Sequence, residues 1–110
     1  MWRTPDLRTV QLTGAQNTMG KVVLVQYPGL YGRELASIAR PPNIGLFMLS
    51  FAVEDVEGLY EVFQKNHVNV IAPPTEIEFP LSGKTHVMTA RSPNGVMLEF
   101  FQEDAPRRAR

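Results

Sequence analysis

Among the side chains that could do chemistry, Glu99 stands in the least expected place. It lies in the middle of the apolar run Val96–Gln102, which follows a Pro-Asn-Gly turn and is predicted to be a strand. Glutamate is depleted in strands and is seldom buried without a partner. Because side chains alternate along a strand, Glu99 shares a face with Met97 and Phe101. Two interpretations follow: a polar group in a cavity wall, or an exposed glutamate on an edge strand.

His86 is the second candidate for chemistry. The segment that contains it is predicted to pair with Val96–Gln102 across a four-residue turn, Ser92–Gly95. In that register Met88 faces Glu99, and His86 lies diagonal to Glu99 at about 7–8 Å between backbones. The two side chains could form a hydrogen-bonded pair or half of a metal site. The simpler alternative is a partly buried histidine with a water or backbone partner. Glu99 and His86 are therefore the candidate catalytic residues.

Several further side chains are expected on the face that carries Glu99, away from the helix. Methionine adapts to irregular shapes, so a methionine-rich face suits a ligand cavity, and it suits contact with a second copy of the chain equally well. The candidate ligand-binding residues are Met48, Ser50, Met88, Met97 and Phe101.

Helical spacing predicts one main helix. Glu54-Asp55 offers an N-cap, and Asn66 tolerates the left-handed conformation that often ends a helix. The helix is predicted over Val56–Asn66 and is expected to pack on a sheet. The helix side chains expected in this packing are Val56, Leu59, Tyr60 and Phe63, and the matching sheet side chains are Phe47, Leu49, Phe51, Leu98 and Phe100.

Strands are predicted on both sides of this helix. Residues 44–102 follow the order β-α-β-β-β, and one helix can cover only one face of the resulting sheet. The predicted strands are Ile44–Val53, Val68–Ala72 (ended by Pro73-Pro74), Lys84–Arg91 and Val96–Gln102, with Thr75–Leu81 as a loop or irregular edge.

The rest of the chain is simpler. Residues 1–29 are expected to form a hairpin of Leu7–Thr13 with Lys21–Tyr27, residues 30–43 a linker, and residues 103–110 a flexible tail. The whole is expected to be a single α+β domain, with a mixed, curved sheet and one main helix.

Composition bounds the class of protein. The chain has 110 residues, 44% of them hydrophobic, and its 11 basic and 11 acidic side chains give no net charge. Such a balance does not indicate nucleic acid as a partner. The absence of cysteine excludes disulfides, thiolate metal sites and a cysteine nucleophile. No membrane span or signal peptide is visible, so a soluble, cytoplasmic protein is expected.

Three segments in succession resemble the vicinal oxygen chelate superfamily, which includes glyoxalase I, bleomycin-resistance proteins and extradiol dioxygenases. They are the run Ser50–Val56 leading into the helix, Ala72-Pro73-Pro74 after a strand, and the closing run Ser92–Glu99. The resemblance implies two βαβββ modules around a cavity. Only the second module is complete here, and Leu7–Tyr27 resembles the last hairpin of a first one. The chain thus resembles a member shortened at its N-terminus.

The metal ligands that the resemblance implies are mostly replaced. Metal-dependent members carry a histidine three residues before the Phe of the Phe-Ala-Val run, and this position is Met48 here. The matching position on the first hairpin is Val23, while the carboxylate of the last strand is kept as Glu99. One carboxylate does not hold a divalent transition metal. No cofactor is expected, and a divalent metal would have only Glu99 and His86 as candidate ligands.

Three functions remain open from the sequence. The first is a glyoxalase/bleomycin-resistance-like protein that binds a small, partly apolar molecule without chemistry. The second is a metal-dependent lyase, isomerase or dioxygenase whose site is completed across a dimer. The third is a non-catalytic interaction or remnant module with no small-molecule ligand. The interpretation favours a binding protein over an enzyme, and it expects a homodimer because an apolar sheet face is seldom left in water.

Overall fold

The computed structural model describes residues 7–14, 21–29, 31–35, 37–81 and 83–103 of the chain. The predicted tail over residues 103–110 lies outside them, apart from Glu103. The chain divides into two compact units, Met1–Arg33 and Glu34–Arg110.

The first unit is a β-hairpin. Strand β1 (Arg8–Leu12) pairs antiparallel with β2 (Val22–Gln26), with Arg8 opposite Gln26 and Leu12 opposite Val22. Both strands fall within the ranges predicted from the alternation of the sequence, so the predicted hairpin is confirmed.

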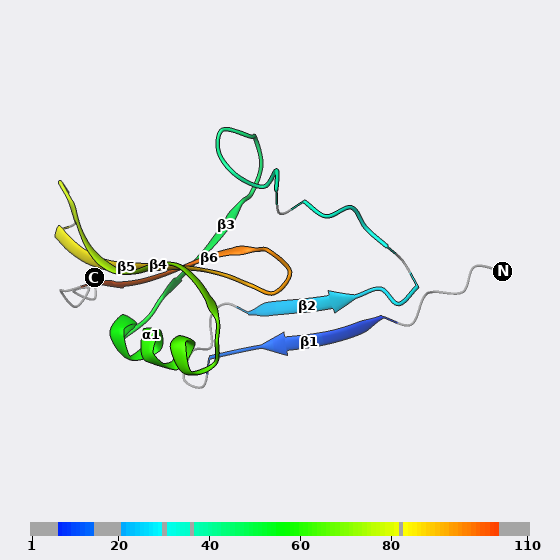
Figure 1. Ribbon diagram of the computed structural model, residues 1–110, viewed down its shortest axis with the longest axis horizontal. Coiled ribbons are helices and arrows are strands. Elements are labelled where there is room, and N and C mark those ends of the chain that lie inside the picture. Colours follow the sequence, from blue (N-terminus) through cyan, green and yellow to red (C-terminus); the bar gives the residue numbers. More distant parts are fainter. Residues whose placement is uncertain (1–6, 15–20, 30, 36, 82, 104–110) are drawn as a thin grey trace. The chain divides into compact units, whose positions relative to one another are not determined.

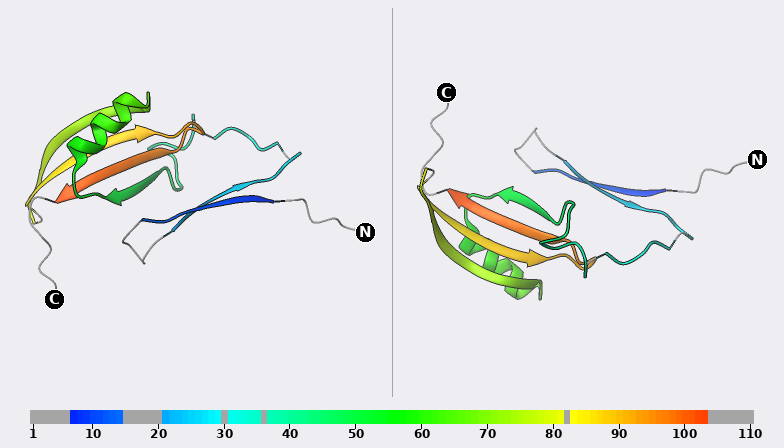
Figure 2. Two further views of the ribbon diagram at one scale, coloured as in Figure 1. Left: turned by 90° about the horizontal axis from the view of Figure 1, so that it is seen from below. Right: turned by 90° about the horizontal axis from the view of Figure 1, so that it is seen from above.

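The second unit is a helix on a mixed four-stranded sheet, as the α+β prediction required. The sheet order is β3-β6-β5-β4, with β3 parallel to β6 and the other pairs antiparallel. The sheet is twisted and curved, and the helix lies across one of its faces (Figures 1 and 2). The elements are β3 (Met48–Ala52), α1 (Val56–Lys65), β4 (Asn69–Phe79), β5 (Gly83–Arg91) and β6 (Met97–Glu103).

Helix α1 begins where two acceptors meet its first backbone N–H groups. The Asp55 side chain accepts a hydrogen bond from Gly58 N at 3.0 Å, as expected of an N-cap. Gln102 Oε1 of β6 accepts a second one from Val56 N at 2.8 Å, which ties the helix start to the sheet. At the other end, Asn66 is the C-cap. The predicted helix is confirmed to within one residue.

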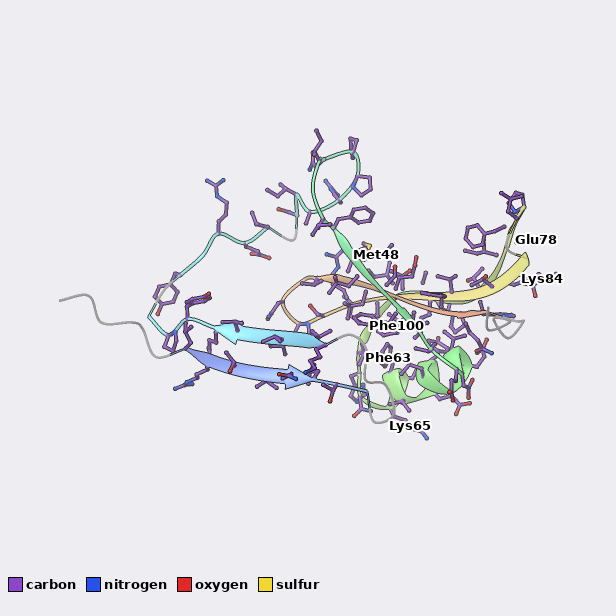
Figure 3. All side chains as sticks on the ribbon, turned by 180° about the vertical axis from the view of Figure 1, so that it is seen from behind. Met48, Phe63, Lys65, Glu78, Lys84 and Phe100 are labelled. Carbon is purple, nitrogen blue, oxygen red and sulfur yellow. The ribbon has the colours of Figure 1, made fainter. Side chains whose placement is uncertain are left out.

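Aromatic rings fill the space between α1 and the sheet. Phe100 of β6 meets Phe63 of the helix edge to face, with 5.3 Å between ring centroids, and stacks on Phe51 of β3 at 5.7 Å. Figure 3 shows Phe63 and Phe100 between the two layers. Among the described residues, the buried apolar side chains are Val56, Met88 and Ala90.

The register of the β5–β6 hairpin differs from the prediction by one residue. Arg91 pairs with Met97, so residues 92–96 form the connection and Thr89, not Met88, lies opposite Glu99. The cause is Gly95, which adopts a left-handed φ of 85° after a turn in which its N–H bonds Ser92 O. A glycine in this conformation adds one residue to one strand of a hairpin. A slip of one residue reverses the face of every side chain.

Two predicted strands have different bounds. The second strand does not end at Pro73-Pro74, and the predicted loop Thr75–Leu81 is mostly strand, because β4 runs from Asn69 to Phe79. Two register irregularities lie between Val70 and Thr75, and the second of them contains both prolines. An edge strand such as β4 tolerates proline. The first strand is shorter than predicted and starts only at Met48.

Candidate functional site

Glu99 is paired with a hydroxyl group. The parallel pairing of β3 with β6 sets Ser50 beside Glu99, and Ser50 Oγ donates a hydrogen bond to Glu99 Oε1 at 2.8 Å. On the other side of β6, Thr89 of β5 is the cross-strand neighbour of Glu99. Since Phe100, the next residue, packs against α1, the Glu99 side chain belongs to the face that the helix leaves uncovered.

Apolar side chains flank this polar pair along the strands. Met48 lies beside Met97 at one end, and Ala52 lies beside Phe101 at the other. Met48, Met97, Glu99 and Phe101 are half-buried. We call this surface the Glu99 face and define it by Met48, Ser50, Ala52, Thr89, Met97, Glu99 and Phe101.

The charge of Glu99 is not neutralised by an ion pair within the described part of the chain. An ion pair there joins Glu76 to Lys84 at 2.9 Å, and His86 Nε2 lies 3.7 Å from Glu76 Oε2; all three residues are on the β4–β5 hairpin. By strand register, Arg91 is the basic residue nearest to Glu99 on this face. It lies two residues beyond Thr89 along β5 and opposite Met97. Its Nη1 donates to Gly95 O at 3.1 Å, which directs the guanidinium to the turn.

Two predicted site residues lie on the opposite face of the sheet. Met88 pairs with Phe100 and is fully buried beneath α1. His86 pairs with Gln102, and its Nε2 lies near Glu76 Oε2 instead of Glu99. The prediction that His86, Met88 and Glu99 share one face is therefore wrong. It assumed the register of a four-residue turn, and the observed register differs from it by one residue.

The structure brings together the other predicted residues of the site: Met48, Ser50, Met97, Glu99 and Phe101. Sequence reasoning missed the contact between Ser50 and Glu99 and the places of Thr89 and Arg91. The signal available in the sequence was Gly95 after Pro93-Asn94, since a glycine there favours a bulged turn over a four-residue one.

A hollow of about 270 Å³ opens at the Met48 end of the Glu99 face. It is mostly apolar and is lined by Leu35, Ala39, Leu46, Phe47, Met48, Leu49, Asn94, Gly95 and Val96. A second, more polar hollow of about 750 Å³ lies where the end of α1 meets the β5–β6 turn, and Asn66, His67 and Arg91 are among its lining residues.

The residues present do not fit the metal that the resemblance implies. Met48 supplies a thioether where metal-dependent members have a histidine, and a thioether is a poor ligand for Zn²⁺, Mn²⁺ or Fe²⁺. Within the described ranges, no three His, Asp or Glu side chains come together as a ligand set. In the same ranges, no helix is long and apolar enough to cross a membrane.

Comparison with solved structures shows the fold. A protein described as a "conserved domain protein" superposes with a TM-score of 0.53 at 19% identity, over 87% of this chain and 70% of the other. An integron cassette protein from the mobile metagenome of V. cholerae gives 0.52 at 16% identity, over 87% and 75%. A glyoxalase/bleomycin resistance protein/dioxygenase from Alicyclobacillus acidocaldarius gives 0.49 at 13% identity, over 76% and 61%.

No protein-family model matches the sequence, and the curated proteins compared with it gave no match. The likenesses to solved structures concern the fold alone. The second unit has the β-α-β-β-β order that the sequence resemblance implied, with its first strand parallel to its last. The chain therefore shares its fold with solved structures that include the conserved domain protein and the integron cassette protein.

Proposed function

We propose that this chain is a small-molecule-binding protein and that the Glu99 face takes a partly apolar ligand. The observation that carries the proposal is the hydrogen bond from Ser50 Oγ to Glu99 Oε1 in the middle of a methionine- and phenylalanine-lined surface. Ligand sites are typically apolar surfaces with a few fixed polar groups that orient the ligand.

The division of the sheet into two faces supports this proposal. One face is occupied by α1, where Phe63 and Met88 are packed against Phe100. The other carries Met48, Met97 and Phe101 without a helix over them. The resemblance to bleomycin-resistance proteins, which enclose a ligand without chemistry, points in the same direction.

We further propose that a second copy of the chain encloses the ligand. A sheet face covers a ligand from one side only, whereas ligand pockets bury most of the ligand surface. A two-fold related copy would place one Glu99 face over the other, with the ligand between them.

A fragment screen read by methionine methyl resonances tests the binding function. Met48 and Met97 report on the Glu99 face, while Met88 is buried on the opposite side of the sheet and serves as an internal control. We expect fragments with an apolar body to shift the Met48 and Met97 methyl signals and to leave Met88 unchanged. Hits that shift only Met88, or a screen without any shift at Met48 and Met97, would contradict the proposal.

A further inference from the structure

We infer that the Glu99 face selects ligands that carry a protonated amine on an apolar body. The inference rests on the proposed binding function and specifies its ligand class. It follows from the charge of Glu99, from what surrounds that charge, and from where the nearest positive charge lies.

The Glu99 carboxylate has capacity for a cationic donor. Ser50, a neutral hydroxyl, bonds Oε1, and no other described residue donates a hydrogen bond to either carboxylate oxygen. Glu76 differs, since it has Lys84 and His86 as partners. A carboxylate that is half-buried without a counter-charge favours a positively charged ligand group over a neutral one.

The neighbours of Glu99 suit the rest of such a ligand. Phe101 lies two residues along β6 on the same face, and its neighbour on β3 is Ala52, whose small side chain leaves the ring accessible. An aromatic face attracts an ammonium group as well as an apolar body. Met97, on the other side of Glu99, can follow the shape of an irregular apolar group.

Arg91 is the feature that could favour an anionic ligand instead. It lies opposite Met97 at the end of β5, whereas the direct neighbour of Glu99 on that strand is the neutral Thr89. The Arg91 guanidinium is bonded to Gly95 O at the turn. Among the described residues, Glu99 therefore places negative charge at the centre of the face, and Arg91 places positive charge at its edge.

Three matched probes test the inference: 2-phenylethylamine, 2-phenylethanol and phenylacetate. Their affinities for the full chain are measured by titrating the Met48 and Met97 methyl signals, with Met88 as the control. Because a hydrogen bond to a charged group contributes more than a neutral one, we expect the amine to bind about tenfold more tightly than the alcohol. The carboxylate is expected to bind most weakly.

Two variants complete the test. Glu99→Gln keeps the size of the side chain and removes its charge, so it should remove the preference for the amine and leave the alcohol affinity within about twofold. Glu76→Gln is the matched control, because it removes a carboxylate of the same sheet that lies outside the Glu99 face. It should leave the preference unchanged, and an unshifted Met88 signal reports that each variant is folded.

The outcomes separate this inference from the function on which it rests. If the alcohol or the carboxylate shifts Met48 and Met97 with an affinity equal to that of the amine, the face binds small molecules but not by charge, and the inference is wrong. The inference is also wrong if Glu99→Gln still binds the amine more tightly than the alcohol. If none of the three probes shifts these signals, both the inference and the binding function are contradicted.

Discussion

The Glu99 carboxylate is hydrogen-bonded to the Ser50 hydroxyl group, and this contact decides which chemistry the Glu99 face can support. Ser50 orients the carboxylate through a 2.8 Å hydrogen bond but leaves its charge in place. A carboxylate in this state can accept hydrogen bonds from a ligand. By itself it cannot hold a transition metal, which needs three or four N or O ligands.

The first residue-scale prediction concerns metal content. Purified chain is expected to hold no stoichiometric transition metal, because Met48 and Val23 stand where metal-dependent members of the superfamily supply ligands. Elemental analysis after extensive dialysis measures this directly. About one metal ion per chain, lost in Glu99→Ala, would refute the prediction.

The second residue-scale prediction concerns the core. Met88 is fully buried beneath α1, so Met88→Ala should lower the free energy of unfolding by about 3 kcal/mol through lost contacts and a cavity. Urea denaturation followed by circular dichroism measures the change. Val62→Ala is the control: Val62 lies on α1 and is 50% exposed, and its loss should cost less than about 0.5 kcal/mol. Equal losses would mean that Met88 is not part of the core.

At the scale of elements, the start of α1 contains a conflict between two helix-stabilising effects. Gly58 is in the first turn, where alanine would normally stabilise a helix by about 1 kcal/mol. A Cβ added at Gly58 would meet the carboxylate of Asp55, which is the N-cap that bonds Gly58 N. Displacing that cap costs about 1 kcal/mol.

We therefore expect Gly58→Ala to change the free energy of unfolding by less than about 0.5 kcal/mol, because gain and loss offset each other. In an Asp55→Ala background the cap is already absent, and the same glycine substitution should stabilise by about 1 kcal/mol. Thermal unfolding of the unaltered chain, the two single variants and the double variant gives the free energies of unfolding for this double-mutant cycle. A full stabilisation by Gly58→Ala alone would show that the cap moves aside without cost.

Periodicity was sufficient to predict every element of the second unit, because the spacing of apolar residues changes at Asp55 and again after His67. The positions of His86 and Met88 could not be predicted in the same way. Their face depends on a single backbone dihedral at Gly95, and alternation along β5 is equally consistent with either register. The length of β4 was missed for a different reason: prolines end a central strand but not an edge strand, and strand order is not visible in the sequence.

At the scale of the whole molecule, we expect a homodimer in solution. Monomers rarely expose contiguous apolar patches larger than a few hundred Å², and α1 packs on the sheet face opposite to the Glu99 face. Sedimentation equilibrium at micromolar concentration should give twice the chain mass of 12.4 kDa.

A charge placed on the face tests where the dimer forms. Ala52 is exposed on the Glu99 face, so Ala52→Glu should shift the equilibrium toward the monomer, because it adds negative charge to an interface that already contains Glu99 from both copies. Val62→Glu adds the same charge to the exposed side of α1 and should leave the dimer intact. If the unaltered chain is a stable, folded monomer, the prediction of a dimer formed through the Glu99 face is contradicted.

The pairing of β3 also has a consequence for the order of folding. Strands β4, β5 and β6 are joined by short connections, whereas β3 meets β6 across 49 residues of chain, as the Ser50–Glu99 bond shows. Contacts of long sequence separation form late, because the entropy of closing the loop must first be overcome. As an edge strand with one partner, β3 is also expected to detach before the rest of the sheet opens. Half of the Glu99 face would then exist only after β3 has docked. A bound amine should accordingly slow hydrogen exchange at the β3 amides more than at those of β5.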